Sequence, residues 1–173
     1  SQVFFTTDHP NGAPFTSYPE LLRLLMDYDY RSECASKINK TSYEMSYLRD
    51  IKRVYTMNDI AIMTRSEPAK ILGLSDRGSL APGCLADISI YNPNLKYDKM
   101  FRKPVYVFKD GNEIVKNGKI NNFFKTKTQA LNLSYDKNIE KYINKWIGKQ
   151  YSLNTDDLSV DGNYFRSDNF NFH

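Results

Sequence analysis

The stretch Val3-Phe-Phe-Thr-Thr-Asp8-His9-Pro-Asn11-Gly12 decides the fold predicted for this chain. Its apolar start, rich in β-branched and aromatic residues, runs into polar residues and then into a Pro/Gly turn. Such a run, bounded by turn residues, predicts a buried strand. A carboxylate between a strand and the following loop lies where α/β barrels carry their chemistry, so Asp8 is the first candidate for a catalytic residue.

The same aspartate has a second interpretation. Asp side chains accept hydrogen bonds from backbone N–H groups two residues further on, and His9 to Gly12 is a typical turn sequence. On that interpretation Asp8 only caps a turn. The spacing of the residues does not distinguish the two interpretations.

The size and composition favour a folded protein of one domain or slightly more. The chain has 173 residues, of which 40% are hydrophobic and 14% aromatic, which is enough for a packed core and unlike a disordered chain. No apolar run approaches the ~18 residues of a membrane span, and no basic signal-peptide region precedes the first apolar run. Cys34 and Cys84 have neither metal-ligand nor disulfide spacing. We therefore expect a cytoplasmic protein without membrane contact.

The net charge of +4 raises the question of a nucleic-acid partner. The lysines are spread along the chain, and their densest runs, 116–127 and 137–149, alternate with apolar residues as solvated faces do. No combination of aromatic and basic residues typical of a nucleic-acid-binding fold is present. We therefore expect no nucleic-acid partner.

Helix signals dominate the first half of the chain. Ser17-Tyr-Pro-Glu20 predicts a helix start, with a hydroxyl cap, a proline in the first turn and an acid near the positive end. Thr56 and Asp59 have the spacing of a capping box, and Ser66-Glu-Pro68 predicts the start of a second short helix. Residues 27–50 predict short helices and loops.

Strand and hairpin signals follow Leu74. Ile88-Ser-Ile90 predicts a strand, and Asp110-Gly111 and Asn117-Gly118 are signals for type I′ hairpin turns. Two such turns seven residues apart predict a three-stranded antiparallel meander. A sheet of such short strands needs a partner surface to bury its face.

The C-terminal region combines an amphipathic helix with an aromatic tail. Residues 136–148 place apolar side chains at i, i+3, i+4, i+7 and i+8 and lysines on the other side, with Asp136 as the predicted cap. Trp146 on the apolar stripe is expected to anchor against a neighbouring surface. The tail of residues 154–173 carries four aromatic residues and is expected to lie against another chain or domain.

Two stretches resemble one protein family. Thr6 to Pro19, which reads Thr-Thr-Asp-His-Pro-Asn-Gly-Ala-Pro-Phe-Thr-Ser-Tyr-Pro, resembles a segment of the amidohydrolase-type subunit of formylmethanofuran dehydrogenases. That subunit belongs to the amidohydrolase superfamily of metal-dependent barrels. Asp76 to Tyr91 resembles the Gly-x-Leu-x-x-Gly-x-x-Ala-Asp string with which many amidohydrolases end.

The resemblance implies an α/β fold. The chain would be the C-terminal fragment of a metal-dependent TIM-type barrel, with the last strand and closing helices, followed by a small antiparallel β-domain and a C-terminal helix. The expected boundaries are 1–73 for the end of the barrel domain, 74–122 for the small β-domain and 123–173 for the C-terminal helix and tail. Asp87 is implied to be structural, binding the amides of a turn.

The activity that the resemblance implies is the condensation of formate with methanofuran, and hydrolysis of the formyl group in the reverse direction. Asp8 matches the aspartate that touches the metal centre and moves the proton of the nucleophile, so it is the expected catalytic and metal-binding residue. His9, Asn11 and Gly12 are the expected substrate-binding residues.

The implied cofactor is a dinuclear zinc centre. The chain has two histidines and no His-x-His pair, and zinc sites need three or more protein ligands, so Asp8 alone cannot hold the metal. We therefore expect this chain to be part of a larger subunit and inactive when isolated. Partner subunits are implied, one of which carries a molybdenum or tungsten pterin that supplies formate.

Three positions depart from the family pattern. Ala13 stands where Gly is common, Ser17 stands where Arg is common, and Cys84-Leu85 replaces small or polar residues. These departures and the missing metal ligands leave other assignments open. One is a different amidohydrolase, either a cyclic-amide hydrolase or part of a formyltransferase/hydrolase complex. The other is a non-catalytic module for subunit assembly.

Overall fold

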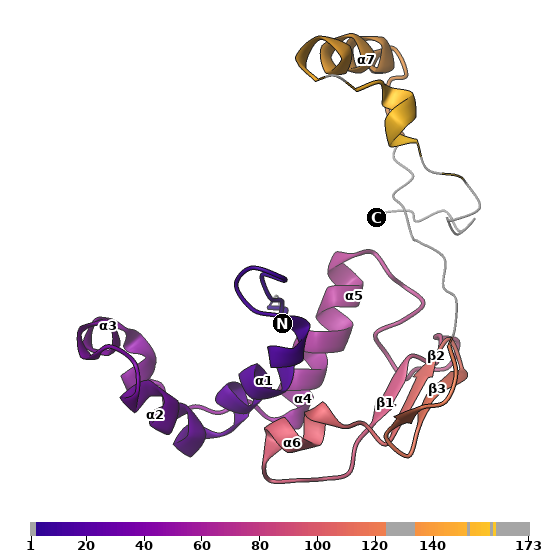
Figure 1. Ribbon diagram of the computed structural model, residues 1–173. Helices are drawn as coiled ribbons and strands as arrows, with labels where there is room; N and C mark the ends of the chain where they lie inside the picture. Colours follow the sequence, from indigo (N-terminus) through magenta and orange to yellow (C-terminus); the bar gives the residue numbers. More distant parts are fainter. Residues whose placement is uncertain (1–2, 124–133, 152, 160, 162–173) are drawn as a thin grey trace. The chain divides into compact units, whose positions relative to one another are not determined.

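The computed structural model describes residues 3–123, 134–151, 153–159 and 161 (Figure 1). The chain divides into two compact units, Ser1–Phe124 and Lys125–His173. The first unit is an α/β structure with a small antiparallel sheet, as predicted. Among the described helices, none is long and apolar enough to cross a membrane.

Short helices precede the sheet of unit 1, and one more lies between its first two strands. They are η1 (Phe15–Ser17), α1 (Tyr18–Met26), α2 (Tyr28–Ser36), α3 (Lys40–Met45), η2 (Tyr47–Asp50), α4 (Met57–Ala61), η3 (Ile62–Ser66), α5 (Glu67–Ile71) and α6 (Tyr97–Arg102). The short helices predicted between residues 27 and 50 are confirmed as α2, α3 and η2.

Helix α1 begins where the sequence predicted, but its cap is different. Pro19 lies in the first turn and Glu20 is the acid near the positive end. Ser17 makes no side-chain capping hydrogen bond, so the predicted hydroxyl cap is wrong. The reason is that η1 runs directly into α1: Ser17 already has helical backbone angles (φ −81°, ψ −14°), whereas a capping residue is extended.

Helices α4, η3 and α5 form one continuous helical run. The predicted capping box at its start is confirmed: Thr56 Oγ1 accepts from the Asp59 N–H at 3.2 Å, and Asp59 Oδ2 accepts from the Thr56 N–H at 2.8 Å. The second helix predicted from Ser66 is present as α5, although Ser66 has helical angles and caps nothing. The π-helical turn η3 carries the chain between α4 and α5 without a break.

The sheet contains four strands in sequence order. They are β1 (Ile88–Ile90), β2 (Tyr106–Lys109), β3 (Asn112–Lys116) and β4 (Lys119–Ile120), and every neighbouring pair is antiparallel.

Both predicted type I′ turns connect these strands. Asp110 and Gly111 have φ of 49° and 79°, and Asn117 and Gly118 have φ of 50° and 73°. Because both central residues of a type I′ turn require positive φ, which Asp, Asn and Gly tolerate, these pairs fit the turn. The predicted meander is therefore confirmed, with β1 added along the edge of β2.

The hydrophobic core of unit 1 lies between α1 and α4. Its buried members are Leu22 and Met26 of α1 and Ile60 of α4. Partly buried hydrophobic residues pack around it: Phe5, Leu25, Tyr55, Tyr97 and Phe101.

Helix α6, which the sequence did not predict, is tied to α1 by two ion pairs. Arg23 Nη1 binds Asp98 at 2.9 Å, and Arg102 Nη2 binds Glu20 at 2.6 Å. Lys96, at the start of α6, makes no side-chain cap. Contacts with α1, which are distant in sequence, therefore hold a helix that has no local start signal.

The strand predicted at residues 3–5 is absent from the structure. A strand exists through pairing with its neighbours, and no described strand runs beside this segment. Its backbone instead meets the helices, where the Phe5 N–H donates to the carbonyl of Met63 at 2.9 Å.

Unit 2 contains helix α7 (Ile139–Gln150) and the short helix η4 (Thr155–Leu158). The predicted helix is confirmed, but its predicted cap is wrong. Asn138 is the N-cap residue, and Asp136 accepts from the Asn138 N–H at 2.9 Å in the turn before the helix. The aromatic residues predicted to bind a partner from the tail lie outside the described residues.

Candidate active site

The loop after Asp8 is closed by the main chain. The Asp8 carbonyl accepts from the Gly12 N–H at 2.7 Å and from the Ala13 N–H at 3.3 Å, and the bond between His9 and Pro10 is cis. The Asp8 side chain makes no hydrogen bond or ion pair with any described residue. The carboxylate therefore does not cap the turn, which was the alternative interpretation of this residue.

Segment 4–8 is extended and alternates like a strand. Phe5 and Thr7 are half-buried, whereas Phe4, Thr6 and Asp8 are exposed. Successive side chains of an extended chain point to opposite sides, so Phe5 packs toward the core while Asp8 points outward. The segment thus retains the side-chain alternation of a strand without strand pairing.

Gly12 leaves room for the Asp8 side chain. A Cβ atom at Gly12 would lie 2.9 Å from Asp8 Cβ and 3.0 Å from Asp8 Oδ2. Contacts this short require one of the two groups to move. A glycine at this position therefore allows the turn to close over Asp8 without displacing its carboxylate.

His9 is held from one side by an aromatic stack. Its ring lies on Phe15 with centroids 4.0 Å apart and an angle of 12°, and Phe15 lies parallel to Tyr18 at 6.1 Å. Tyr18 in turn contacts Phe5, with centroids 5.2 Å apart. The stack joins the loop to the start of α1. His9 and Asn11 are both exposed beside Asp8.

Sequence reasoning missed the residues that support this loop. Phe5 and Phe15 provide the apolar contacts, and the hydroxyl of Thr7 is buried with no hydrogen-bond partner among the described residues. The alternation at 4–8 was the available signal for Phe5 and Thr7. Nothing in the sequence pointed to the stacking of Phe15 on His9.

The described residues do not form a complete metal site. They contain no group of three or more His, Cys, Asp or Glu side chains placed to hold a metal ion. Asp8 offers one carboxylate, whereas zinc sites use at least three protein ligands. A metal at this loop would therefore require ligands from other polypeptide.

Asp87, the other aspartate next to a β-strand, has a different environment. Its carboxylate accepts from Lys109 Nζ at 2.5 Å, from the Asp110 N–H at 2.9 Å and from Arg77 Nη1 at 3.3 Å. Burial alone raises the pKa of Asp87, but the hydrogen bonds from Lys109 and Asp110 and the nearby positive charges outweigh it and lower the pKa below its ordinary value. This geometry fits the structural role expected for Asp87.

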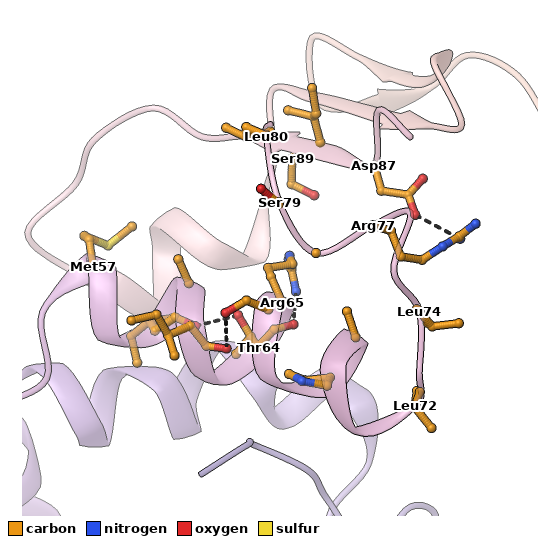
Figure 2. A pocket seen from close by; sticks show the side chains of 18 of the residues that line it. Met57, Thr64, Arg65, Leu72, Leu74, Arg77, Ser79, Leu80, Asp87 and Ser89 are labelled. Atoms are coloured by element: carbon orange, nitrogen blue, oxygen red, sulfur yellow. Dashed lines mark hydrogen bonds and ion pairs between the residues drawn. The ribbon is translucent and has the colours of Figure 1, made fainter. Parts of the chain in front are cut away.

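A cavity of about 510 Å³ lies between the α4–η3–α5 run and the chain that leads into β1 (Figure 2). Most of its lining is apolar, including Met57, Leu72 and Leu74. Figure 2 shows Arg77 and Asp87 paired at its border, so their charges already have partners. Asp8 is not among the lining residues. The cavity therefore has the character of a packing surface.

Comparison with known proteins places the chain in a family. Residues 1–119 match the amidohydrolase family. The chain belongs to that family.

Two relatives are similar over most of this chain. The chain is 38% identical over 159 residues to a subunit of the formyltransferase/hydrolase complex Fhc of Methylorubrum extorquens, covering 92% of this chain and 29% of the relative. It is 34% identical over 178 residues to "Protein FwdA" of Methanocaldococcus jannaschii, covering 96% of this chain and 31% of the relative.

A solved structure is similar as well. It is the X-ray crystal structure of the formyltransferase/hydrolase complex (FhcABCD) from Methylorubrum extorquens in complex with methylofuran. The TM-score is 0.81 at 38% identity, with 94% of this chain and 30% of that chain covered. These matches confirm the resemblance found from Thr6 to Pro19 and from Asp76 to Tyr91. The chain spans less than a third of the length of these relatives.

Proposed function

We propose that this amidohydrolase chain provides the proton-transfer aspartate of a subunit that forms and hydrolyses the formyl amide of a methanofuran-type amine. The observation that carries the proposal is the state of Asp8. Its carboxylate is exposed, has no partner among the described residues and stands beside a turn that Gly12 keeps open. A carboxylate without a structural partner is available to accept and return a proton.

In the hydrolytic direction Asp8 accepts a proton from the water that attacks the formyl carbon. The tetrahedral species then collapses, and Asp8 returns the proton to the amine nitrogen as the C–N bond breaks. The free amine and formic acid are released, and the acid loses its proton to solvent as formate. In the condensing direction formate first takes up a proton from solvent, and the amine attacks the formyl carbon of the resulting formic acid. Asp8 takes the proton from the attacking amine and returns it to the departing hydroxyl, which leaves as water. His9 and Asn11, exposed on the same loop, would contact the substrate.

Amidohydrolases generally use metal ions, and we propose a dinuclear zinc centre for the complete subunit. Such a centre supplies a water of lowered pKa and polarises the formyl carbonyl. Within the described part of this chain Asp8 is the candidate ligand, and the other ligands would come from polypeptide beyond this chain. The isolated chain is accordingly expected to be inactive.

The proposed organisation follows the expected boundaries. Residues 1–73 would close the barrel, 74–122 would form the small β-domain and 123–173 would form the C-terminal helix and tail. Partner subunits would bind the complete subunit, in the cytoplasm, and one of them would supply formate from a molybdenum or tungsten pterin centre. The relative solved as FhcABCD, a complex of several subunits bound to methylofuran, supports the partners and the class of amine.

The test is Asp8→Asn in the complete subunit within its complex. Loss of a general acid–base group lowers kcat by roughly 10²- to 10⁴-fold. We expect that loss with unchanged assembly, since the Asp8 side chain makes no hydrogen bond or ion pair with a described residue. Asp29→Asn, at an exposed aspartate of α2, is the matched control and should keep full activity. Near-normal turnover of the Asp8 variant would refute the proposal.

A second candidate is a protein that hands the formyl group to another carrier without any redox partner. The 38% identity to part of a formyltransferase/hydrolase complex favours it. The two candidates differ in what co-purifies with the complete subunit. A pterin-bearing redox partner and formation of the formyl amide from carbon dioxide would support the first. A non-catalytic role is tested by metal analysis of this chain alone. Stoichiometric zinc would contradict that role, and it would also contradict a metal site shared with other polypeptide.

A further inference from the structure

His9 is the outer member of a row of aromatic rings. Its imidazole lies on the Phe15 ring with centroids 4.0 Å apart and planes 12° apart, and Phe15 lies nearly parallel to Tyr18 with centroids 6.1 Å apart. Tyr18 contacts Phe5, which packs against the hydrophobic core of unit 1. The row is therefore anchored in the fold at one end, and His9 forms its other end.

The His9 imidazole packs on Phe15 with one face, and no described ring contacts its other face. His9 is exposed, and its side chain makes no hydrogen bond or ion pair with a described residue. Phe15 is itself 60% exposed, so aromatic surface continues beside His9. A ring whose plane is fixed from one side presents its other face as a flat surface on which a second ring can stack.

This flat surface lies next to the carboxylate that the proposed function uses. His9 directly follows Asp8, and consecutive Cα atoms are about 3.8 Å apart. His9 also begins the turn, so the alternation that sends neighbouring side chains to opposite sides ends with Asp8. The turn lies against the carboxylate, since a Cβ atom at Gly12 would be 3.0 Å from Asp8 Oδ2. A small molecule that lies on the His9 ring can therefore reach the carboxylate of Asp8.

We infer that the outer face of the His9 imidazole binds the furan ring of the amine, while Asp8 meets the nitrogen of the same molecule. The inference rests on the proposed function, which supplies the class of amine. The similar solved structure holds methylofuran, and the match to it covers 94% of this chain. A furan is a flat aromatic ring, and aromatic rings prefer parallel, offset packing on one another. Aromatic walls with a few polar groups are typical of small-molecule sites.

The packing of His9 on Phe15 favours contact through the face of the imidazole. Phe15 fixes the plane of the ring before the ligand arrives, which lowers the entropy lost on binding. A metal ion or a hydrogen-bonding group would bind His9 through a ring nitrogen, at the edge of the imidazole. Polypeptide from outside this chain would instead cover the face and leave no preference for a flat ligand. These uses of His9 give results that differ from those of ring stacking.

The experiment compares two amines on the complete subunit within its complex. Furfurylamine has a flat furan ring, whereas the ring of tetrahydrofurfurylamine is saturated and puckered. Both carry the amine on the same one-carbon link, so Asp8 meets the same nitrogen in each. Both dissociation constants are measured by ligand-observed NMR titration.

Two variants separate the face of the His9 ring from its edge. His9→Phe keeps an aromatic ring and removes both ring nitrogens, whereas His9→Asn keeps hydrogen-bonding atoms and removes the ring. The control is Tyr47→Ala, which removes an exposed ring of η2 that is remote in sequence from the loop. The zinc content of each variant is measured alongside.

We expect the wild type to bind furfurylamine about two- to tenfold more tightly than the saturated amine, as one aromatic stack provides. His9→Phe and Tyr47→Ala should keep this preference, and His9→Asn should abolish it, all with unchanged zinc content. Equal binding of the two amines by the wild type would overturn the inference. So would a preference that His9→Asn retains or His9→Phe loses, or a loss of zinc in His9→Phe.

Failure of this inference and failure of the proposed function give different results. Binding of the two amines is measured at equilibrium and requires no turnover. Equal binding together with an inactive Asp8→Asn variant would remove the ring site and leave the proposed function. A preference for furfurylamine that depends on the His9 ring, together with an active Asp8→Asn variant, would support the ring site and remove the proton-transfer role of Asp8.

Discussion

Asp8 ends an extended segment with strand-like alternation, and Asp87 directly precedes strand β1. The number of donors around the two carboxylates differs. Asp87 has three donors within 3.3 Å and a side chain that is 27% exposed. Asp8 is exposed, and no described residue donates to its carboxylate. A carboxylate whose acceptor positions are filled contributes to the fold. One whose positions are free can take part in a reaction.

The supports of the two aspartates differ in the same way. Lys109 and Arg77 hold the carboxylate of Asp87 itself, so the network fixes the side chain. Around Asp8 the main-chain turn and Gly12 fix only the backbone and leave the side chain open. This contrast predicts that substitutions near Asp87 affect stability and that substitutions near Asp8 affect turnover.

The largest effect on stability is expected for Asp87→Asn. Arg77, only 12% exposed, and Lys109 would lose one of the anions that they share and would keep the other, Asp110. Loss of a charged hydrogen-bond partner at a partly buried site costs roughly 1–3 kcal/mol of the free energy of unfolding. Urea unfolding of the complete subunit measures it, with Asp29→Asn as the control. An unchanged free energy of unfolding would show that the network around Asp87 has no structural role.

Gly12→Ala tests the prediction that substitutions near Asp8 affect turnover. The new Cβ would meet the Asp8 side chain within 3.0 Å and push the carboxylate from its position. Because small misplacements of catalytic groups are costly, we expect kcat to fall about tenfold while the free energy of unfolding changes by less than ~1 kcal/mol.

The matched control for this change is Gly148→Ala in α7, where an added Cβ meets no atom within 4 Å. That variant should keep full turnover and gain up to ~1 kcal/mol of stability, since alanine favours helices more than glycine does. Equal turnover of the Gly12 and Gly148 variants would contradict the role assigned to Gly12.

Phe15→Leu sharpens the account of the loop. The stacking of Phe15 on His9 would be lost, and aromatic pairs of this kind contribute about 0.5–1.5 kcal/mol. We expect a higher KM with a nearly unchanged kcat, because in the proposed mechanism His9 contacts the substrate and Asp8 moves the proton. Steady-state kinetics separates the two constants, and a fall in kcat alone would argue against this division of roles.

The smallest expected effect is that of acidification on the contribution of Asp87 to the free energy of unfolding. The pKa of Asp87 is lowered from 3.8, so its contribution to stability is complete above that value and is lost as the pH falls through the lower, folded-state pKa. The difference in unfolding free energy between wild type and Asp87→Asn should therefore be constant above about pH 4 and shrink below it. A difference that shrinks between about pH 5 and 7 would contradict the lowered pKa.

The local features of the fold could be predicted from the sequence because each depends on a few adjacent residues. The capping box at Thr56 and Asp59 and the turns at Asp110-Gly111 and Asn117-Gly118 are of this kind. The strand predicted at residues 3–5 is not formed among the described residues, because no described strand runs beside it and pairing partners are not a local property. Helix α6 was missed for a similar reason, since it is held by long-range ion pairs from Arg23 and Glu20 and has no cap signal.

The central residue of the candidate site could be predicted, but its supports could not. Asp8 was found from its place between an apolar run and a turn and from resemblance. The contact of Phe15 with His9 and the space that Gly12 leaves for Asp8 arise from the closed turn, which no sequence pattern specifies. The roles of Asp8, His9, Asn11 and Gly12 stay predictions until they are tested.

The measurement that tests the central claim most directly is anomalous X-ray diffraction at the zinc edge on crystals of the complete subunit. The account predicts a metal centre at the end of segment 3–8, with an Asp8 carboxylate oxygen about 2.0–2.2 Å from a zinc ion and the remaining ligands from other polypeptide. A fully liganded metal centre remote from Asp8, with the Asp8 carboxylate free in solvent, would contradict it.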